Sequence, residues 1–267
     1  MSKINISKNI VILSYLVGFL VSVTSLFGIF VSATYTKETT NWAVQAKGQD
    51  VANLVVVLVL VISTFYLSNK SFKGYLVWLG SYLYLIYAYV IYAFCVHFNH
   101  LFLMYVAVLG LSIYLPLLSL ININLEQVQA TFSKSKNLKP GSILLFVIGI
   151  MFILLWLSEI IPSMLSGNTP DSFLITGLWT NPVHVLDLGI YLPAMIMTAV
   201  SVWRKKDVGY FMLVPLLVFS ATMGLGIISL FAILSFSNGE SFPVPGYIIG
   251  LLVILSSYFS YRIVRKI

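Results

Sequence analysis

Charged residues are scarce in this chain of 267 residues. Only 9% of the residues are charged, whereas 60% are hydrophobic and the mean hydropathy is +1.00. Soluble domains carry about 25% charged residues, so this composition cannot supply a water-facing surface. A lipid bilayer tolerates such a chain because hydrocarbon takes the place of the polar shell. The composition therefore predicts an integral membrane protein.

Cysteine and the familiar catalytic motifs are also lacking. Cys95 is the one cysteine of the sequence, which excludes an internal disulfide and any CxxC metal or redox motif. The sequence contains no HExxH, Walker A, GxSxG or Rossmann glycine pattern, and no rhomboid or aspartyl intramembrane protease signature. No lysine lies in the seventh apolar run, so a retinal Schiff base cannot form there. These absences leave the activity open.

Long apolar runs dominate what is present. A helix of roughly 20 apolar residues crosses the hydrocarbon, and helices are expected because lipid leaves no partner for unpaired backbone groups. A β-barrel would instead show alternating segments of about ten residues. We therefore predict an all-α, polytopic bundle of about eight transmembrane spans, forming one domain over residues 1–267. The predicted spans are 9–30, 51–67, 75–96, 101–121, 143–161, 183–202, 209–234 and 246–261.

The basic residues lie almost entirely on one side of this stack. Lys37 and Lys47 fall on the other side, whereas the remaining Lys and Arg flank the spans at the end that holds both termini. Basic loops stay in the cytoplasm, so the sequence predicts a cytoplasmic-membrane protein with both termini inside. Anionic lipid headgroups are the expected partner of this charge, and nucleic acid is not.

The amino terminus has two interpretations. Lys3 and Lys8, the apolar run and Val31-Ser32-Ala33 resemble a secretory signal peptide with a small-residue cleavage site. The run covers roughly 20 residues, longer than the usual signal core of about 7–15. A retained first span is the favoured interpretation, and a cleaved signal peptide is the alternative.

Three further patterns concern the loops and the order of the spans. Leu125, Val128 and Phe132 recur at helical spacing and predict a short helix on the membrane surface. Asn181-Pro182 is typical of the cap and first turn of a helix, here the sixth span. Similar long outer loops, and Gly-Tyr pairs at spans three and seven, predict a parallel repeat of four plus four spans, with halves 1–121 and 140–267. Chance similarity is the alternative.

Two acidic residues, Glu159 and Asp187, lie inside predicted spans. At 1.5 Å per residue both lie roughly 10 Å outside the bilayer centre. Carboxyl groups in lipid are costly and usually functional. We expect the two to face each other between spans five and six and to share a proton or bind a cation. His184 lies on the same helical face as Asp187, and Asn181 about one turn further out. In the alternative, each acid bonds separately to a hydroxyl and only joins helices.

The other candidates also belong to the outer side. Asp50 opens span two, and His97 and His100 occupy the short turn before span four. Asp50 is a candidate binding residue, whereas His97, His100 and His184 are candidate ligands for zinc or another divalent metal. The competing interpretation is that Asp50, His97 and His100 are solvated loop residues.

Two segments carry a resemblance to known sequences. Gly48-Gln49-Asp50 and the segment Asn181-Pro182-Val183-His184-Val185-Leu186-Asp187-Leu188 resemble a pattern found in uncharacterised bacterial multi-span membrane proteins. The resemblance implies a bacterial cytoplasmic membrane and no particular activity.

Three functions remain in competition. The leading hypothesis is a binding or transport protein for a cation, a proton or a small molecule, with its site open to the outside. The alternative is a metal-dependent hydrolase acting at the outer leaflet. The third is an accessory subunit whose polar groups only hold helices together.

Overall fold

The structure is a computed structural model, and it describes residues 4–121, 123, 132, 138–239 and 241–267. Eight helices in this part of the chain are long and apolar enough to cross a membrane, as predicted, and no strand is present there. The spans are α1 (Lys8–Phe30), α2 (Thr40–Ser68), α3 (Phe72–Cys95), α4 (Phe102–Leu120), α6 (Leu138–Ser166), a composite sixth span, α10 (Asp207–Asn238) and α11 (Val244–Lys266). The surface helix predicted around Leu125 and Val128 falls almost wholly outside the described residues.

The sixth span is built from three pieces. It comprises α8 (Pro182–Leu186), the π-helical segment η2 (Asp187–Tyr191) and α9 (Leu192–Trp203). Asn181 caps the span and accepts a 2.9 Å hydrogen bond from the Val183 amide, so the predicted cap is confirmed. Among the elements with described bounds, the short helices η1 (Ser32–Tyr35) and α7 (Asp171–Thr176) lie outside the spans.

The second span begins earlier than the sequence predicts. α2 begins at Thr40, where the Thr39 hydroxyl caps it by accepting a 3.2 Å bond from the Trp42 amide. The polar stretch before Asp50 was expected to be a loop because it is not apolar. It forms helix instead, so Asp50 lies well within α2 rather than at its start.

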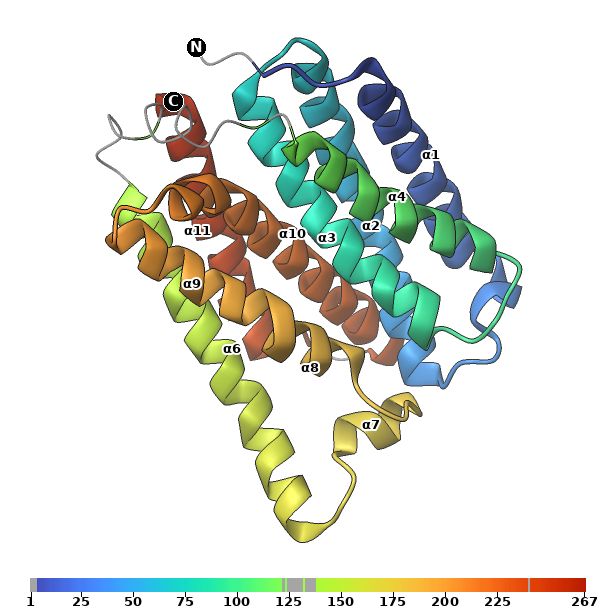
Figure 1. Ribbon diagram of the computed structural model, residues 1–267. Helices are drawn as coiled ribbons and strands as arrows, with labels where there is room; N and C mark the ends of the chain where they lie inside the picture. The colour runs from blue at the N-terminus through green and yellow to red at the C-terminus, as the bar shows by residue number, and fades with distance from the viewer. Residues whose placement is uncertain (1–3, 122, 124–131, 133–137, 240) are drawn as a thin grey trace.

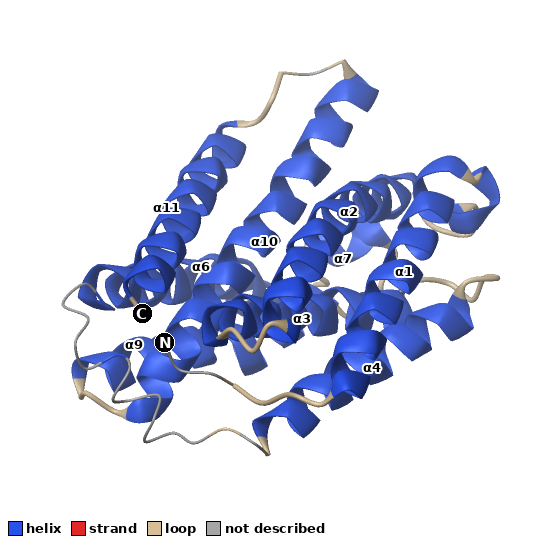
Figure 2. Cartoon of the chain, turned by 90° about the horizontal axis from the view of Figure 1, so that it is seen from above, coloured by secondary structure: helices blue, strands red, loops and turns tan. Residues whose placement is uncertain are grey.

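α3 and α10 form the centre of the bundle (Figure 2), with α1 and α4 to one side and α6, α9 and α11 to the other. α3 is the most buried span, with 67% of its apolar window inside the protein, against 22% for α6 and for α11. Gly80 lets the two central helices approach closely, because a Cβ there would lie 2.6 Å from Val218 and 2.7 Å from the Pro215 carbonyl. The tyrosine-rich helix α3 is therefore the packing core of the bundle.

The two halves share one order of helix contacts. In the first, α1 packs on α2, α2 on α3, α3 on α4, and α4 on α1. In the second, α6 packs on α9, α9 on α10, α10 on α11, and α11 on α6. The halves meet where α10 packs on α2 and α3 and where α3 packs on α8. This order agrees with a parallel repeat, and superposition of the halves stays a prediction.

The bundle has two distinguishable ends (Figure 1). One carries α7 and the turns from α1 to α2 and from α6 to α8; we call it the α7 end. The opposite end, where α11 finishes and α2 turns into α3, we call the terminal end. α7 is fixed to the start of α2, because the Thr39 hydroxyl lies 3.2 Å from the Thr176 carbonyl oxygen.

Candidate functional site

Asp187 begins the π-helical segment in the middle of the sixth span. Pro193, six residues later, has no N–H to donate to the carbonyl of Gly189, so the regular helical bonding is interrupted in this stretch. π-helical turns are rare and occur frequently at functional sites. The sixth span is therefore irregular at its one acidic residue.

Four side chains from α6 and the sixth span form a continuous series, which we call the acid–histidine row: Glu159, His184, Trp156 and Asp187. Nε2 of His184 lies 3.5 Å from Oε2 of Glu159. The Trp156 ring centroid lies 4.5 Å from that of His184, and Nε1–H of Trp156 donates a 2.8 Å hydrogen bond to Oδ2 of Asp187. Contacts thus run without a break from Glu159 to Asp187.

The row leads from the surface into the protein. The Glu159 side chain is 30% exposed, whereas that of His184 is 4% exposed. Glu159 is held in place by α7, because its Oε1 accepts a 3.2 Å hydrogen bond from the Ser172 amide. Within the described residues, neither ring nitrogen of His184 has a hydrogen-bond partner, so the nearby Glu159 carboxylate is its polar neighbour.

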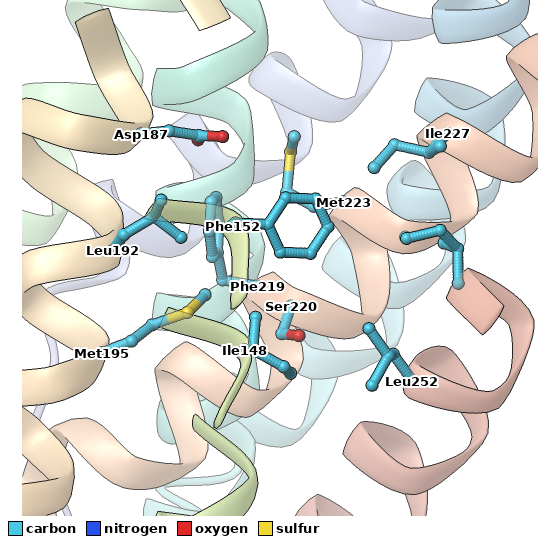
Figure 3. A pocket seen from close by; sticks show the side chains of 12 residues that line it. Ile148, Phe152, Asp187, Leu192, Met195, Phe219, Ser220, Met223, Ile227 and Leu252 are labelled. Carbon is cyan, nitrogen blue, oxygen red and sulfur yellow. The ribbon is translucent and has the colours of Figure 1, made fainter. Parts of the chain in front are cut away.

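Asp187 lines a cavity of about 60 Å³ inside the second half of the bundle (Figure 3). The walls come from α6, the sixth span, α10 and α11, and apart from Asp187 and Ser220 they are apolar or glycine. Figure 3 shows the Asp187 carboxyl at one edge of this space, pointing toward Met223 and Phe152. A cavity of this size can hold a water molecule where polar partners are present.

The sequence placed Glu159 and Asp187 on adjacent helices, and α6 does pack on α9. Their contacts differ from a simple acid pair, because Glu159 contacts His184 and Asp187 contacts Trp156. The described contacts join the two acids through these two rings, and close approach of the carboxyl groups stays a prediction. Asn181 serves as the helix cap through its side-chain oxygen.

Asp50 forms a second polar centre, in the first half of the bundle. It is 1% exposed, so it is not the solvated loop residue of the competing interpretation. The hydroxyls of Tyr35 and Tyr92 donate to its two carboxylate oxygens, at 2.7 and 2.8 Å. Gly28 leaves the room for this carboxyl, because a Cβ there would overlap Oδ2 of Asp50 and lie 2.6 Å from Tyr35 Oη.

Amides and hydroxyls extend the Asp50 centre along α2 and α3. Tyr84 donates a 2.8 Å hydrogen bond to the side-chain oxygen of Asn53, and the Gln49 amide donates to the Tyr84 hydroxyl. Tyr35 lies outside the spans. Its pKa is raised well above the usual range, mainly because the side chain is buried and secondly because the Asp50 carboxyl is adjacent. Tyr35 therefore stays a hydrogen-bond donor to Asp50.

The remaining histidines have other partners. Nδ1 of His97 lies 2.9 Å from Oε2 of Glu38, and the His97 amide donates to the other oxygen of the same carboxyl at 2.7 Å. The ring of His100 lies against Phe27, with centroids 5.8 Å apart. Among the described residues, no group of three or more His, Cys, Asp or Glu could hold a metal ion. The structure does not bring His97, His100 and His184 together as ligands.

Several residues of these centres were not identified as site residues from the sequence. Trp156 was not, although it lies three residues before Glu159 and so shares a face of α6 with it. Tyr92 is one of several tyrosines in α3, and its residue type alone does not distinguish it from the others. Tyr35 and Glu38 carry no periodic signal, because both lie in the irregular connection between α1 and α2.

The fold and these centres define a multi-pass, all-helical membrane protein with carboxyl groups inside its bundle. No known protein family matches the chain, and neither curated proteins nor solved structures give a match.

Proposed function

We propose that this protein binds protons or a small cation at Asp187 and transports them across the membrane, with the acid–histidine row as the entrance. The observation that carries the proposal is the contact between the part-exposed Glu159 and the buried His184. His184 lies on the same helical face as Asp187, whose side chain lines the cavity. We further propose a bacterial cytoplasmic membrane, on the resemblance of the segments around Asp50 and Asp187, with both termini inside, on the basic residues at the terminal end.

The charges of the row favour a positive ligand. Glu159 and Asp187 are acidic, and the ion pair that Glu159 forms within the described residues is with His184. Histidine is the side chain best suited to take up and release a proton near neutral pH. A proton reaching Glu159 can pass to His184, whose Nε2 lies 3.5 Å from the carboxylate. Its onward transfer to Asp187, three residues further along the same face, goes through a bridging water molecule. Trp156 holds both groups but carries no proton, because its indole N–H only donates.

Transport also needs a change of shape, and the sixth span offers a place for it. A π-helical turn followed by a proline has fewer regular backbone bonds to break than a straight helix. Because Asp187 stands at the first residue of this turn, gain or loss of charge on the carboxyl acts directly on the irregular segment.

The test is flux through the purified full chain in liposomes. A pH gradient and, separately, a sodium gradient are imposed, and a dye inside the vesicles reports the flux. We expect wild-type flux well above that of empty liposomes, and Asp187→Asn, which keeps shape and removes charge, to reduce it to that baseline. The matched control is Asp171→Asn, an exposed acid of α7, which should retain the wild-type rate. Full flux in Asp187→Asn would show that the acid–histidine row is not the path.

A further inference from the structure

A large cavity lies at the terminal end, far from the acid–histidine row. It measures about 590 Å³ and lies where α2 ends, α3 begins and α11 finishes. Its polar end carries Lys70, Ser71 and Lys73, and its remaining wall is mainly apolar. Ligand pockets commonly measure about 300–1,000 Å³, so the space suits an organic molecule rather than an ion alone.

The polar end is built to receive a negative group. α3 is a helix of 24 residues whose first turn lines this cavity at Phe72 and Lys73. Ser71 Oγ caps the Gly74 amide, and the amides of Phe72 and Lys73 precede the first acceptor within the helix. No acidic residue lies in that turn, whereas the first turn of α10 contains Asp207. Helix N-termini and lysines both attract phosphate. Neither ion pair of the described residues involves Lys70 or Lys73.

The backbone fixes one of these lysines in an unusual position. Lys70 has a φ of 61°, in the left-handed region that residues with a Cβ seldom adopt. Its N–H donates to the Leu67 carbonyl at 2.8 Å, and its own carbonyl accepts from the Ile4 amide at 3.1 Å. The turn from α2 to α3 is therefore held in a defined shape, with a cationic side chain beside the first turn of α3.

The rest of the wall suits a hydrocarbon chain. Val59 and Ile62 of α2, Val77 of α3 and Val264 of α11 line it, and Ile62 is 57% exposed. The hydroxyl of Ser63, also in the wall, already donates to the Leu60 carbonyl at 2.9 Å. An apolar groove that continues from an end lined by two lysines matches a lipid with an anionic headgroup.

We propose that this cavity is a specific site for an anionic phospholipid, with the phosphate at Lys70, Lys73 and the start of α3, and an acyl chain along Ile62 and Val77. Charge complementarity selects an anionic headgroup, and the apolar wall selects a lipid over free phosphate. The site is independent of the proposed transport, because it shares no residue with the acid–histidine row.

Binding of phosphatidylglycerol to the delipidated, purified full chain tests the headgroup. Lysines near an anionic headgroup each contribute roughly fivefold, so Lys70→Gln with Lys73→Gln should weaken binding about 25-fold. The matched control is Lys205→Gln with Lys206→Gln, which removes two positive charges at the same end of the bundle but outside this cavity. Its affinity for phosphatidylglycerol should be within about twofold of wild type. An equal loss of affinity in both double variants would overturn the site, because binding would then depend only on general surface charge.

A second pair of variants tests the acyl chain. Ile62→Trp fills the groove and should reduce binding, whereas Leu58→Trp, one turn earlier and 63% exposed outside the cavity, should not. Phosphatidylcholine and inorganic phosphate serve as comparison ligands in the same measurement. Protection against thermal unfolding by phosphatidylglycerol, but by neither comparison ligand, supports the proposal. Equal protection by inorganic phosphate would assign the site to free phosphate and overturn the lipid assignment.

Discussion

The indole of Trp156 donates a 2.8 Å hydrogen bond to Oδ2 of Asp187, which ties α6 to the first residue of the π-helical segment. The same ring lies against His184, so one side chain sets the position of both titratable groups of the sixth span. Trp156 is therefore a positioning residue. Its contribution can be separated from simple helix packing by a change that keeps the ring and removes the donor.

Trp156→Phe should retain the ring contact with His184 and leave one oxygen of Asp187 without its donor. Loss of a partner for a buried polar group costs about 1–3 kcal/mol, so thermal unfolding in detergent should occur at a lower temperature. The pH at which flux is half-maximal should also move, because the donor acts on a titrating carboxyl. Trp203→Phe is the control: Nε1 of Trp203 donates a 3.0 Å bond to Ser142, between the same two helices but at the terminal end. If the pH of half-maximal flux is unchanged in both variants, Trp156 acts only through packing.

Gly28 predicts a steric test of the Asp50 centre. Gly28→Ala places a methyl group where the Asp50 carboxyl lies, so we expect a loss of about 1–3 kcal/mol in the free energy of unfolding. Gly18→Ala, on the same helix, meets Val61 Cγ2 at 3.6 Å and Val57 Cγ1 at 3.8 Å, which are ordinary contacts. The higher helix propensity of alanine should leave stability unchanged or raise it by up to about 1 kcal/mol. Equal stability of the two variants would contradict the observed packing of Asp50 against α1.

The raised pKa of Tyr35 predicts a difference in alkaline stability. A tyrosine whose pKa is higher in the folded than in the unfolded state binds more protons when folded. Its stabilising contribution is complete below the unfolded value of about 10 and is lost as the pH rises toward the folded value. Tyr35→Phe should therefore lose less stability than wild type above about pH 10. Tyr114→Phe, a change at a side chain 65% exposed, should follow the wild-type curve. Parallel curves for wild type and Tyr35→Phe would exclude this linkage.

The orientation of the chain can be measured with single cysteines in a Cys95→Ser background. An impermeant thiol reagent applied to intact cells should label cysteines at positions 45 and 175, and should not label those at 136 and 266. The physical reason is the concentration of basic residues at the terminal end. Labelling of position 136 from outside would reverse the orientation, and the acid–histidine row would then open to the cytoplasm.

The repeat hypothesis makes a geometric prediction. α1 to α4 should superpose on α6, the sixth span, α10 and α11 through an axis along the membrane normal, because both halves follow the same order of contacts. An experimental structure of the protein in lipid measures this. Halves whose helices cross at unrelated angles would show that the shared order arose without duplication.

The spans could be predicted from the sequence because hydropathy records contact with lipid. Seven of the eight begin within about five residues of the expected position, as α1 at Lys8 and α10 at Asp207 illustrate. The exception is α2, whose first turns contain polar residues that lie among other protein segments. Hydropathy interprets such a segment as a loop, and the same error placed Asp50 at the membrane surface instead of in the interior.

The acid–histidine row could be predicted only in part. Spacing placed His184 and Asp187 on one face, and depth placed Glu159 near them on the adjacent helix. The sequence could not show that an indole from α6 connects these groups, because tryptophan is equally common in packing. It also could not show the π-helical turn, which depends on how α9 continues past Pro193 against its neighbours.

α3 contacts both polar centres. Its Tyr92 donates to Asp50, and its Leu83 carbonyl accepts a 2.9 Å hydrogen bond from Tyr191, the last residue of the π-helical segment that Asp187 begins. A shift of α3 by a fraction of an ångström would lengthen bonds in both halves together. If ligand at one carboxyl favours one position of α3, it changes the affinity of the other carboxyl, and thermodynamic reciprocity requires the second to act on the first by the same factor. Two acids in separate halves would then respond as one cooperative unit.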